Sequence, residues 1–365
     1  MAQATAAFIA GLPKVELHVH IQGVLDAPLR HKLAQKNNVP DIADTVEGLE
    51  RRYQEFFSAC CDRSTDVAEL SRGFFELFER GGRVLVTADD FYELAMLYYR
   101  RAAQMNVRYA EPFIDFMELT RWGVSLDTQM AGYRRAQVEA KRTLGVKSAW
   151  VLSFSRTADP IEMMAAYEDA LRHRDMIVGI GMAGFSDESS PLKFNQLYTR
   201  ARQDGFRLTI HCDPTVPAPA IHQHIRECVT QLGGGGVDRI DHGISAADST
   251  GLVDLLRRNA IGLTICPWTS LPALMHHDDP DQAFFEGVVR RLFDSGVRIS
   301  IHSDDPALAG QNWVQEALEV VADRAKFTQE EVVQLSLNAV EMSWASCEAK
   351  AMLREEIVAY QASPA

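Results

Sequence analysis

The sequence predicts an α/β fold: a closed (β/α)8 TIM barrel with a helical insertion after the first strand and further helices at the C-terminus. Two observations predict it. Short runs rich in β-branched and aromatic residues alternate with longer amphipathic stretches, which is the pattern of a parallel sheet and its covering helices. In addition, four apolar runs each end in histidine or aspartate, and a parallel barrel brings the carboxyl ends of its strands together at one rim.

Eight runs have the length and composition of strands. They cover Val15–His20, Val107–Phe113, Ser148–Phe154, Ile177–Met182, Arg207–His211, Arg239–His242, Gly262–Cys266 and Arg298–Ser303. Several are apolar almost throughout, as expected for strands that are covered on both faces. Their number and their even spacing after residue 107 favour a closed barrel over an open sheet.

The long gap between the first two strands, about residues 24–105, is predicted to be helical. Its amphipathic stretches are Leu25–Lys36, Val46–Ala59, Val67–Phe78 and Ala88–Gln104. One crossover does not need so much chain, so we expect helices inserted on the catalytic rim of a single domain that spans residues 1–365. The aromatic residues of the insertion either roof the pocket or belong to the core, and helical aromatics are more often core. They are Phe56, Phe57, Phe74 and Phe75.

Composition limits the classes of partner. The formal net charge of −13 argues against nucleic acid or an anionic membrane, because both attract basic surfaces. No apolar run reaches transmembrane length, and the first residues lack the basic start and apolar core of a signal peptide. The 6 cysteines show no C-x-x-C spacing, which predicts reduced thiols and a cytoplasmic protein with a small-molecule partner. Oligomeric state stays open.

Side chains that bind metals end several of the predicted strands. His18 and His20 are two positions apart, so on a strand both imidazoles point to one face. A lone histidine in an apolar run is usually a core residue, but two on one inward face are costly to bury without a shared role. His211 and Asp304 end two other strands. Three neutral imidazoles and one carboxylate suit Zn²⁺ with an open position for water, which a metal ion converts into a nucleophile.

Four motifs follow one another along the chain. They are Leu12–His20, Arg239–Gly243, Cys266–Ser270 and Ser303–Pro306. Together they resemble the adenosine/adenine deaminase family of the metal-dependent amidohydrolase superfamily. Two further stretches, Leu33–Val39 and Asn338–Trp344, are similar to its adenine deaminase branch. The likeness runs from about Phe8 to Glu356. Any one motif is weak, but four in family order are specific.

The resemblance implies a role for individual residues. His18, His20, His211 and Asp304 match the family's metal ligands, with one zinc ion per chain as the expected cofactor. His242 matches the histidine that orients the attacking water and helps to deprotonate it, beside the catalytic Asp304. Asp305 matches an aspartate at the N7 side of the purine, and Gly184 matches a glycine whose backbone contacts the ring.

Two departures from the family pattern concern substrate and proton transfer. The family has His-Ala-Gly-Glu after strand five, and its glutamate protonates the ring nitrogen, whereas this chain reads His211-Cys212-Asp213-Pro214. Proline cannot transfer a proton. Either Asp213 turns into the pocket as the acid, close to Glu111 or Asp305, or it points away and caps the following turn. Gln22 stands where adenosine-using members have an acid that meets the sugar, which disfavours adenosine.

His302 precedes the Ser303-Asp304 motif, where the family has asparagine or a small polar residue. It either supports the metal ligands from behind or faces outward from the strand.

The sequence therefore predicts a zinc-dependent hydrolytic deaminase of an amino-substituted nitrogen heterocycle. Adenine or an N6-substituted adenine ranks first because of Gln22, and a non-purine aminoheterocycle ranks second. Hydrolysis of an amide or cyclic amide is an alternative, since it can proceed without the missing glutamate. A catalytically inactive, metal-holding barrel that binds a purine-like ligand is an alternative from a different class.

Overall fold

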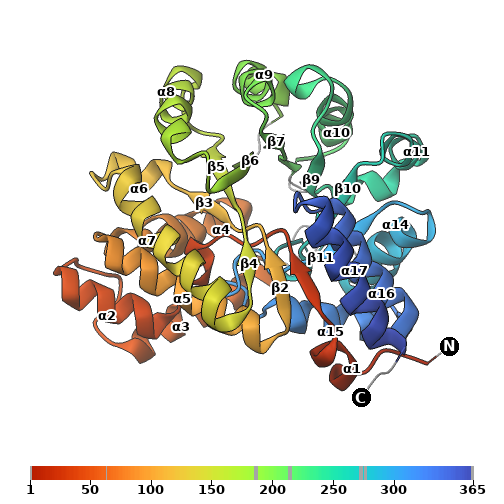
Figure 1. The fold of residues 1–365 in the computed structure, drawn as a ribbon, viewed down its shortest axis with the longest axis horizontal. Coiled ribbons are helices and arrows are strands. Elements are labelled where there is room, and N and C mark those ends of the chain that lie inside the picture. Colours follow the sequence, from red (N-terminus) through yellow and green to blue (C-terminus); the bar gives the residue numbers. More distant parts are fainter. Residues whose placement is uncertain are drawn as a thin grey trace.

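The computed structural model describes residues 2–62, 64–184, 188–212, 216–270, 274 and 278–362. It is a ring of short parallel strands surrounded by helices (Figure 1). The strands are β1 Lys14–Glu16, β2 Val107–Ala110, β3 Phe113–Asp115, β4 Lys147–Ser148, β5 Trp150–Ser155, β6 Ile177–Ala183, β7 Arg207–Leu208, β8 His211–Cys212, β9 Arg239–His242, β10 Gly262–Ile265 and β11 Ile299–Ile301. All eight predicted strand positions are confirmed, and three of them are interrupted, as β2/β3, β4/β5 and β7/β8.

The strands pair in parallel in three ladders, β1-β2-β4, β3-β5-β6-β7 and β8-β9-β10-β11. Single backbone hydrogen bonds join the ladders into a ring. Thr209 N donates to Ile180 O at 2.9 Å, and Asp241 N donates to Ile210 O at 3.0 Å. The last gap closes where Asp304 N donates to His18 O at 3.0 Å and His20 N donates to Asp304 O at 2.9 Å. The predicted (β/α)8 barrel is confirmed.

Helices surround the ring of strands, and further helices precede the first strand and follow the last one. They are α1 Ala6–Gly11, α2 Ala27–Asn37, α3 Val46–Cys60, α4 Val67–Phe74, α5 Ala88–Gln104, α6 Met117–Arg121, α7 Leu126–Glu139, α8 Pro160–Ala170, α9 Asn195–Gln203, α10 Ala220–Thr230, α11 Thr250–Arg258, α12 Pro267–Ser270, α13 Pro280–Phe284, α14 Arg291–Asp294, α15 Val314–Arg324, α16 Gln329–Met342 and α17 Cys347–Ala362. Capping boxes fix where α5 and α16 begin, with the pairs Thr87/Asp90 and Thr328/Glu331. None of the helices in the described part of the chain combines the length and apolarity that a membrane crossing needs.

Four helices, α2 to α5, lie between β1 and β2, as predicted for the insertion. Helix α5 packs against α7 on the outside of the barrel and so acts as the crossover helix. The part of the insertion before α5 forms a second, smaller apolar cluster with the segment that follows strand eight. Leu49, Tyr53 and Leu77 contribute from the insertion, and Ala307 and Leu308 contribute from that segment. This contact holds the inserted helices over the rim at which the ligand-bearing strands end.

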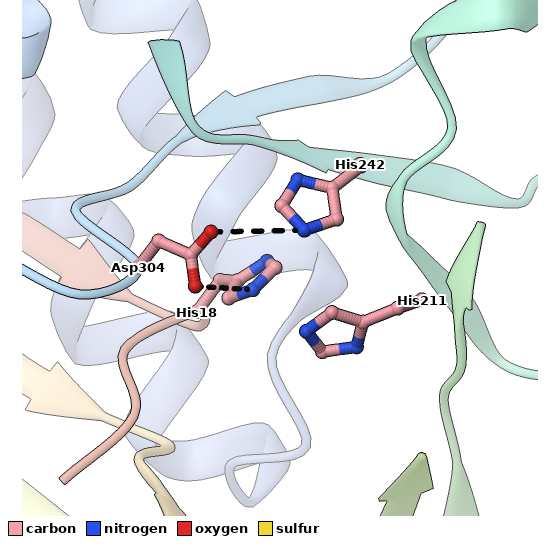
Figure 2. Close-up of side chains that lie close together, drawn as sticks. All are labelled: His18, His211, His242 and Asp304. Atoms are coloured by element: carbon pink, nitrogen blue, oxygen red, sulfur yellow. Dashed lines mark ion pairs between the residues drawn. The ribbon is translucent and has the colours of Figure 1, made fainter. Parts of the chain in front are cut away.

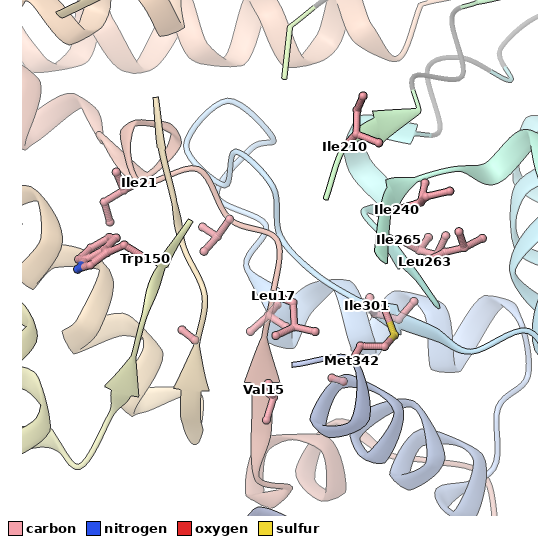
Figure 3. Close-up of a cluster of buried hydrophobic side chains, with 14 of the residues drawn as sticks. Val15, Leu17, Ile21, Trp150, Ile210, Ile240, Leu263, Ile265, Ile301 and Met342 are labelled. Carbon is pink, nitrogen blue, oxygen red and sulfur yellow. The ribbon is translucent and has the colours of Figure 1, made fainter. Parts of the chain in front are cut away.

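The main core lies between the strands and the outer helices. Figure 3 shows part of this core, with Val15, Ile240, Leu263 and Ile301 from the strands and Met342 of α16 near Ile301. Burial of such side chains is the main favourable contribution to folding, at about 1.5–3 kcal/mol for each fully buried large aliphatic residue. The helices and the barrel therefore form one continuous apolar layer.

A buried ion pair lies at the opposite end of the barrel from the ligand-bearing rim. The Arg239 guanidinium donates to Glu111 Oε2 at 2.5 Å and to Leu17 O at 3.2 Å, and it lies 4.0 Å from the ring centre of Trp344. The other Glu111 oxygen accepts from the backbone N–H of Trp344 at 2.5 Å. Both charged side chains are fully buried. Glu111 is therefore already engaged, and it is not among the described residues that line the pocket.

Removal of the Glu111 carboxylate should destabilise the fold strongly. We expect Glu111→Ala to lower the free energy of unfolding by about 3–5 kcal/mol, because it leaves the Arg239 cation buried without its main partner. Urea unfolding of both proteins measures this difference. The matched control is Glu356→Ala, which removes an exposed ion pair with Arg108 and should change stability by about 0–1 kcal/mol. Equal losses in the two variants would contradict a structural role for the buried pair.

Candidate active site

Four side chains from separate strands converge at the carboxyl end of the barrel (Figure 2). His18 follows β1, His211 begins β8, His242 ends β9 and Asp304 follows β11. Each offers a nitrogen or oxygen atom, and these atoms all lie within 4.8 Å of one another. All four residues are buried. Residues almost three hundred positions apart in the sequence thus share one small volume, as the strand-end pattern predicted.

His20 lies at the same place, next to this group. Its Nε2 is 3.1 Å from His211 Nε2 and 3.6 Å from Asp304 Oδ1, and His18 Nε2 is 3.3 Å from the same Asp304 oxygen. Ligand atoms at 2.0–2.1 Å from a tetrahedral zinc ion lie roughly 3.3 Å from one another. The spacing of these atoms therefore suits a common metal ligand set of His18, His20, His211 and Asp304.

Hydrogen bonds and ion-pair contacts on the far side of each imidazole turn its Nε2 toward this point. His18 Nδ1 lies 2.8 Å from Thr264 Oγ1, and His20 Nδ1 lies 2.7 Å from Asp115 Oδ2. His211 Nδ1 lies 3.3 Å from Asp241 Oδ2. A partner at one ring nitrogen selects the tautomer in which the other nitrogen carries a free lone pair.

The electrostatics of the cluster suit a cation. Burial lowers the pKa of His211 to about 3, against the opposing effect of Asp241, so this imidazole is neutral at physiological pH. Burial also lowers the pKa of His20, but Asp115, Asp305 and Asp304 outweigh it and raise this pKa to about 10. Burial alone would raise the pKa of Asp304, yet the charges of the nearby His18, His242 and His20 hold it well below its usual range. The negative charge around His20 attracts a proton or a metal cation.

A buried nitrogen atom without a hydrogen-bond partner tests whether the site fits a metal ion. His18 Nε2 is buried and has no hydrogen-bond partner among the described residues, although it faces the other ligand atoms. A buried polar atom without a partner is unfavourable unless a further group satisfies it. Three imidazoles and a carboxylate are the donor types that zinc and related divalent metals prefer. The residues present therefore fit a divalent metal.

His242 lies on the other side of the Asp304 carboxylate. Its Nε2 is 3.6 Å from Asp304 Oδ2, whereas His18 lies at Oδ1, so the two histidines bracket the carboxylate (Figure 2). Oδ2 also accepts a hydrogen bond from Thr269 Oγ1 at 2.6 Å. His242 and Asp304 have φ angles of 59° and 64°, which are uncommon for residues with side chains and cluster at functional sites. This backbone conformation directs both side chains toward the pocket.

A cavity of ≈ 1020 Å³ opens above these residues. The predicted substrate-binding residues Gln22, Gly184 and Asp305 all line it. Phe56, Phe57 and Phe74 line it too, together with Phe78, whereas Phe75 is exposed. The inserted helices thus roof the pocket. The favoured interpretation of these aromatics as plain core was wrong: Phe56 and Phe74 line the pocket and also pack against the smaller apolar cluster, and Phe75 belongs to neither.

Asp305 faces the pocket beside the predicted metal ligands. Its Oδ1 is buried without a hydrogen-bond partner among the described residues. Burial and the negative charge of Asp304 raise its pKa well above the usual range for a carboxyl. A carboxyl that keeps its proton at neutral pH can donate a hydrogen bond to an acceptor atom of a bound ring.

Some sequence predictions concern residues elsewhere. Asp213 and Pro214 lie outside the described residues, so the proton-donor role of Asp213 stays a prediction. His302 is buried, with Nδ1 accepting from Leu17 N at 3.2 Å and Nε2 2.7 Å from Ser300 Oγ. Ser300 Oγ also contacts Met342 Sδ of α16 at 3.7 Å. Ser300 pairs in register with Thr264, whose hydroxyl contacts His18 inside the barrel, so Ser300 and His302 point to the inner face.

Sequence reasoning missed the residues that hold the ligands in place. Asp115 bonds His20, Thr264 bonds both His18 and Asp241, and Asp241 lies between His18 and His211. Each stands on or directly at the end of a strand, with its side chain on the inner face. The signal that could have found them is a polar residue in an otherwise apolar run, such as Thr264 in Gly262–Ile265.

A parallel barrel whose strand ends join three or four histidines and an aspartate beneath a roofed pocket defines a metal-dependent hydrolase of the amidohydrolase superfamily. The sequence model of the Adenosine deaminase family matches residues 13–360. Adenine deaminase of Rhodospirillum rubrum is 33% identical over 353 residues, which cover 97% of this chain and 98% of the relative. The chain belongs to the adenosine deaminase family, and it is a hydrolytic deaminase that acts on C–N bonds.

Solved structures agree with this assignment. Adenine deaminase from Arthrobacter aurescens superimposes with a TM-score of 0.83 at 28% identity, covering 96% of this chain and 100% of that chain. An amidohydrolase from Burkholderia ambifaria with bound Zn superimposes with a TM-score of 0.81 at 26% identity, covering 98% of each chain. The family and these neighbours support metal dependence of this enzyme.

Gly23 should be essential for the position of Asp305. A Cβ atom on Gly23 would lie 2.0 Å from Asp305 Oδ1 and 2.8 Å from Asp305 Cα, so the backbone of Asp305 would have to move. We expect Gly23→Ala to cost about 1–3 kcal/mol of stability and to lower turnover at least tenfold, with metal content unchanged. Thermal unfolding, metal analysis and a rate assay measure the three effects.

The control for this prediction is Gly251→Ala in α11, where the nearest atom to a new Cβ is 3.8 Å away. This variant should keep full activity and be as stable as the parent or slightly more stable. A Gly23→Ala enzyme with normal turnover would contradict the tight contact with Asp305.

Proposed function

We propose that this protein is a zinc-dependent hydrolytic deaminase of adenine or an N6-substituted adenine. The observation that carries the proposal is the convergence of His18, His20, His211 and Asp304 at the floor of the pocket, with His242 and Asp305 beside them. The relatives named adenine deaminase support the substrate class. The neutral side chain of Gln22 in the pocket supports a base rather than a nucleoside.

Zinc is the proposed metal, with His18, His20, His211 and Asp304 as its ligands. The donor set of three imidazoles and a carboxylate supports it, as does the bound Zn of the Burkholderia neighbour. The metal would supply Lewis-acid activation of water at neutral pH. The proposed ligand set does not include His242, whose Nε2 approaches the opposite oxygen of Asp304 and which we assign a different role.

His242 and Asp304 have complementary roles with respect to the attacking water. His242 Nε2 is positioned to accept a proton from a water held near Asp304 Oδ2 and to pass it on to the departing amino group. Asp304 keeps its negative charge because its pKa is well below the usual range, so it holds the resulting imidazolium in place. Geometry and charge thus make His242 a general base and then a general acid.

Ring recognition falls to Asp305 and Gly184. The protonated Asp305 carboxyl donates a hydrogen bond to a ring acceptor such as N7 of a purine. Gly184 has a φ angle of 97°, and a Cβ there would meet only Arg156 N, at 3.9 Å. The backbone at this position is therefore open to close approach of a planar ring.

Ring-nitrogen protonation needs a further acid, because Pro214 stands at the position of the family's glutamate. We propose Asp213, which follows directly after Cys212 at the end of β8 and is followed by proline. The residue before a proline is restricted to extended conformations, which limits the directions in which its side chain can point.

Ammonia release tests the proposed reaction. We expect the zinc-loaded protein to release ammonia from adenine, as measured by a coupled ammonia assay, or methylamine from N6-methyladenine, as measured by chromatography. Asp304→Ala should lose the metal and all turnover, whereas Asp115→Asn should retain metal more weakly, since second partners of ligands typically contribute 10–100-fold in affinity. Ring opening without ammonia would favour the amide hydrolase. Purine binding without turnover would favour the inactive barrel.

The acid is tested separately from the metal. We expect Asp213→Asn to lower kcat on the true substrate by about two to four orders of magnitude, with fold and metal content unchanged. Circular dichroism and metal analysis control for the last two. A variant with a near-parental rate would exclude Asp213 as the acid and leave Asp305 as the candidate.

A further inference from the structure

The two oxygens of the Asp304 carboxylate face different groups. Oδ1 lies 3.3 Å from His18 Nε2 and 3.6 Å from His20 Nε2, on the side of the predicted metal ligands. Oδ2 lies 3.6 Å from His242 Nε2, and Figure 2 shows His18 and His242 at opposite oxygens of the carboxylate. One oxygen therefore faces the proposed metal, and the other faces the proposed general base.

The Thr269 hydroxyl binds the second of these oxygens. Its Oγ1 donates to Asp304 Oδ2 at 2.6 Å, whereas the alternative acceptor, Cys266 O, is 3.4 Å away. A hydroxyl has one hydrogen to donate, and the short distance to Oδ2 is typical of a charge-assisted hydrogen bond to a carboxylate. The hydrogen therefore points to Asp304. The neighbouring Asp305 Oδ1 receives no such bond from the described residues.

The order of the strands places Thr269 at this point. Strand β10 lies between β9, which ends in His242, and β11, which is followed by Asp304. The short helix α12 begins directly after β10 and carries Thr269. In the same helix, the Trp268 ring packs edge-on against Phe57 of the roof, with ring centres 6.0 Å apart. The hydroxyl is thus held between two strand ends by a turn that the roof covers.

The contact of Oδ2 with Thr269 matters because a carboxylate can bind a metal ion through one oxygen or through both. A catalytic zinc site keeps one coordination position open for water, and a second oxygen from Asp304 would compete for that position. An oxygen that accepts a short hydrogen bond is restrained from turning toward the metal. Removal of the Thr269 hydroxyl removes this restraint.

We propose that Thr269 is a positioning residue, whose hydroxyl limits Asp304 to metal binding through Oδ1 alone. The hydrogen bond leaves a coordination position for water and keeps Oδ2 beside His242, where it stabilises the imidazolium that forms during the reaction. Thr269 acts through Asp304 and does not contact the reacting atoms. This inference rests on the proposed function, and in particular on its metal ligands.

The first measurement needs no substrate. Thr269→Val replaces the hydroxyl by a methyl group of similar size, and Thr269→Ser retains the hydroxyl. In protein loaded with Co²⁺ instead of zinc, Thr269→Val should lower the visible absorption of the metal, because cobalt absorbs less strongly when a further ligand raises its coordination number. Thr269→Ser should keep the parental spectrum. Zinc affinity, measured by competition with a chelator, should be equal or higher in Thr269→Val, whereas loss of a group that supports a ligand typically costs about 10–100-fold.

The second measurement separates kcat from KM. With zinc-loaded protein and adenine, Thr269→Val should lower kcat about 10- to 100-fold, the loss expected for one hydrogen bond to a charged group. KM should change by less than about threefold, because the hydroxyl contacts Asp304 and not the ring. Thr269→Ser should restore the rate. The matched control is Thr230→Val in α10, which removes a hydroxyl bonded to Arg226 O at 2.7 Å and should keep the parental spectrum and rate.

An unchanged cobalt spectrum or a parental kcat in Thr269→Val would overturn the inference. Loss of zinc affinity would also overturn it, because Thr269 would then support the ligand set and not the open position. If Thr269→Val does not fold, Thr269→Ala gives the same comparison with a smaller side chain. If the parent protein deaminates no 6-aminopurine, the proposed function fails, while the cobalt and zinc measurements still decide what Thr269 does.

Discussion

The pairing of the first strand with the last is the contact on which the rest of the site depends. His18 and His20 exchange backbone hydrogen bonds with Asp304, at 3.0 and 2.9 Å. These two bonds close the ring of strands, and they also place the side chains of all three residues around one point. Closure of the barrel and assembly of the ligand set are therefore the same event. An ion bound at this point would in turn stabilise the closed barrel, because it ties the two ends of the sheet together.

Asp241 connects this point with the interior of the barrel. It is fully buried and accepts hydrogen bonds from Thr209 at 2.7 Å and Thr264 at 2.9 Å. Burial opposes its ionisation, but His211, His18 and Arg239 lower its pKa below the usual range. The Arg239 guanidinium lies 3.7 Å from Asp241 on one side and contacts Glu111 on the other. A continuous series of charges thus runs from the barrel interior to the ligands, and each member limits the orientation of the next.

The sequence was sufficient for the barrel and for the convergence of the four predicted ligands, and the reason is local. Strand periodicity puts His18 and His20 on one face, and parallel strands end at one rim, so the convergence of His211 and Asp304 with them follows from pattern alone. The roles of Asp115 and Thr264 do not follow, because they depend on which strands are neighbours in register. The aromatic roof was misjudged for a similar reason. The amphipathic pattern of the helix indicates that Phe56 and Phe57 are covered. It does not indicate whether other core side chains or a bound ligand cover them.

The same register explains how one barrel separates chemistry from recognition. The predicted ligands and His242 come from strands one, five, six and eight, whereas one wall of the pocket comes from strands two to four and the roof from the insertion. Pro214 follows strand five in the sequence, and we propose that it changes which residue transfers the proton. Gln22 follows β1 and lines the pocket, where we propose that its neutral side chain favours a base over a nucleoside. Asp115 at the end of β3 joins the two groups through its bond to His20, so a change elsewhere on strands two to four can alter the pocket while the predicted ligands stay fixed.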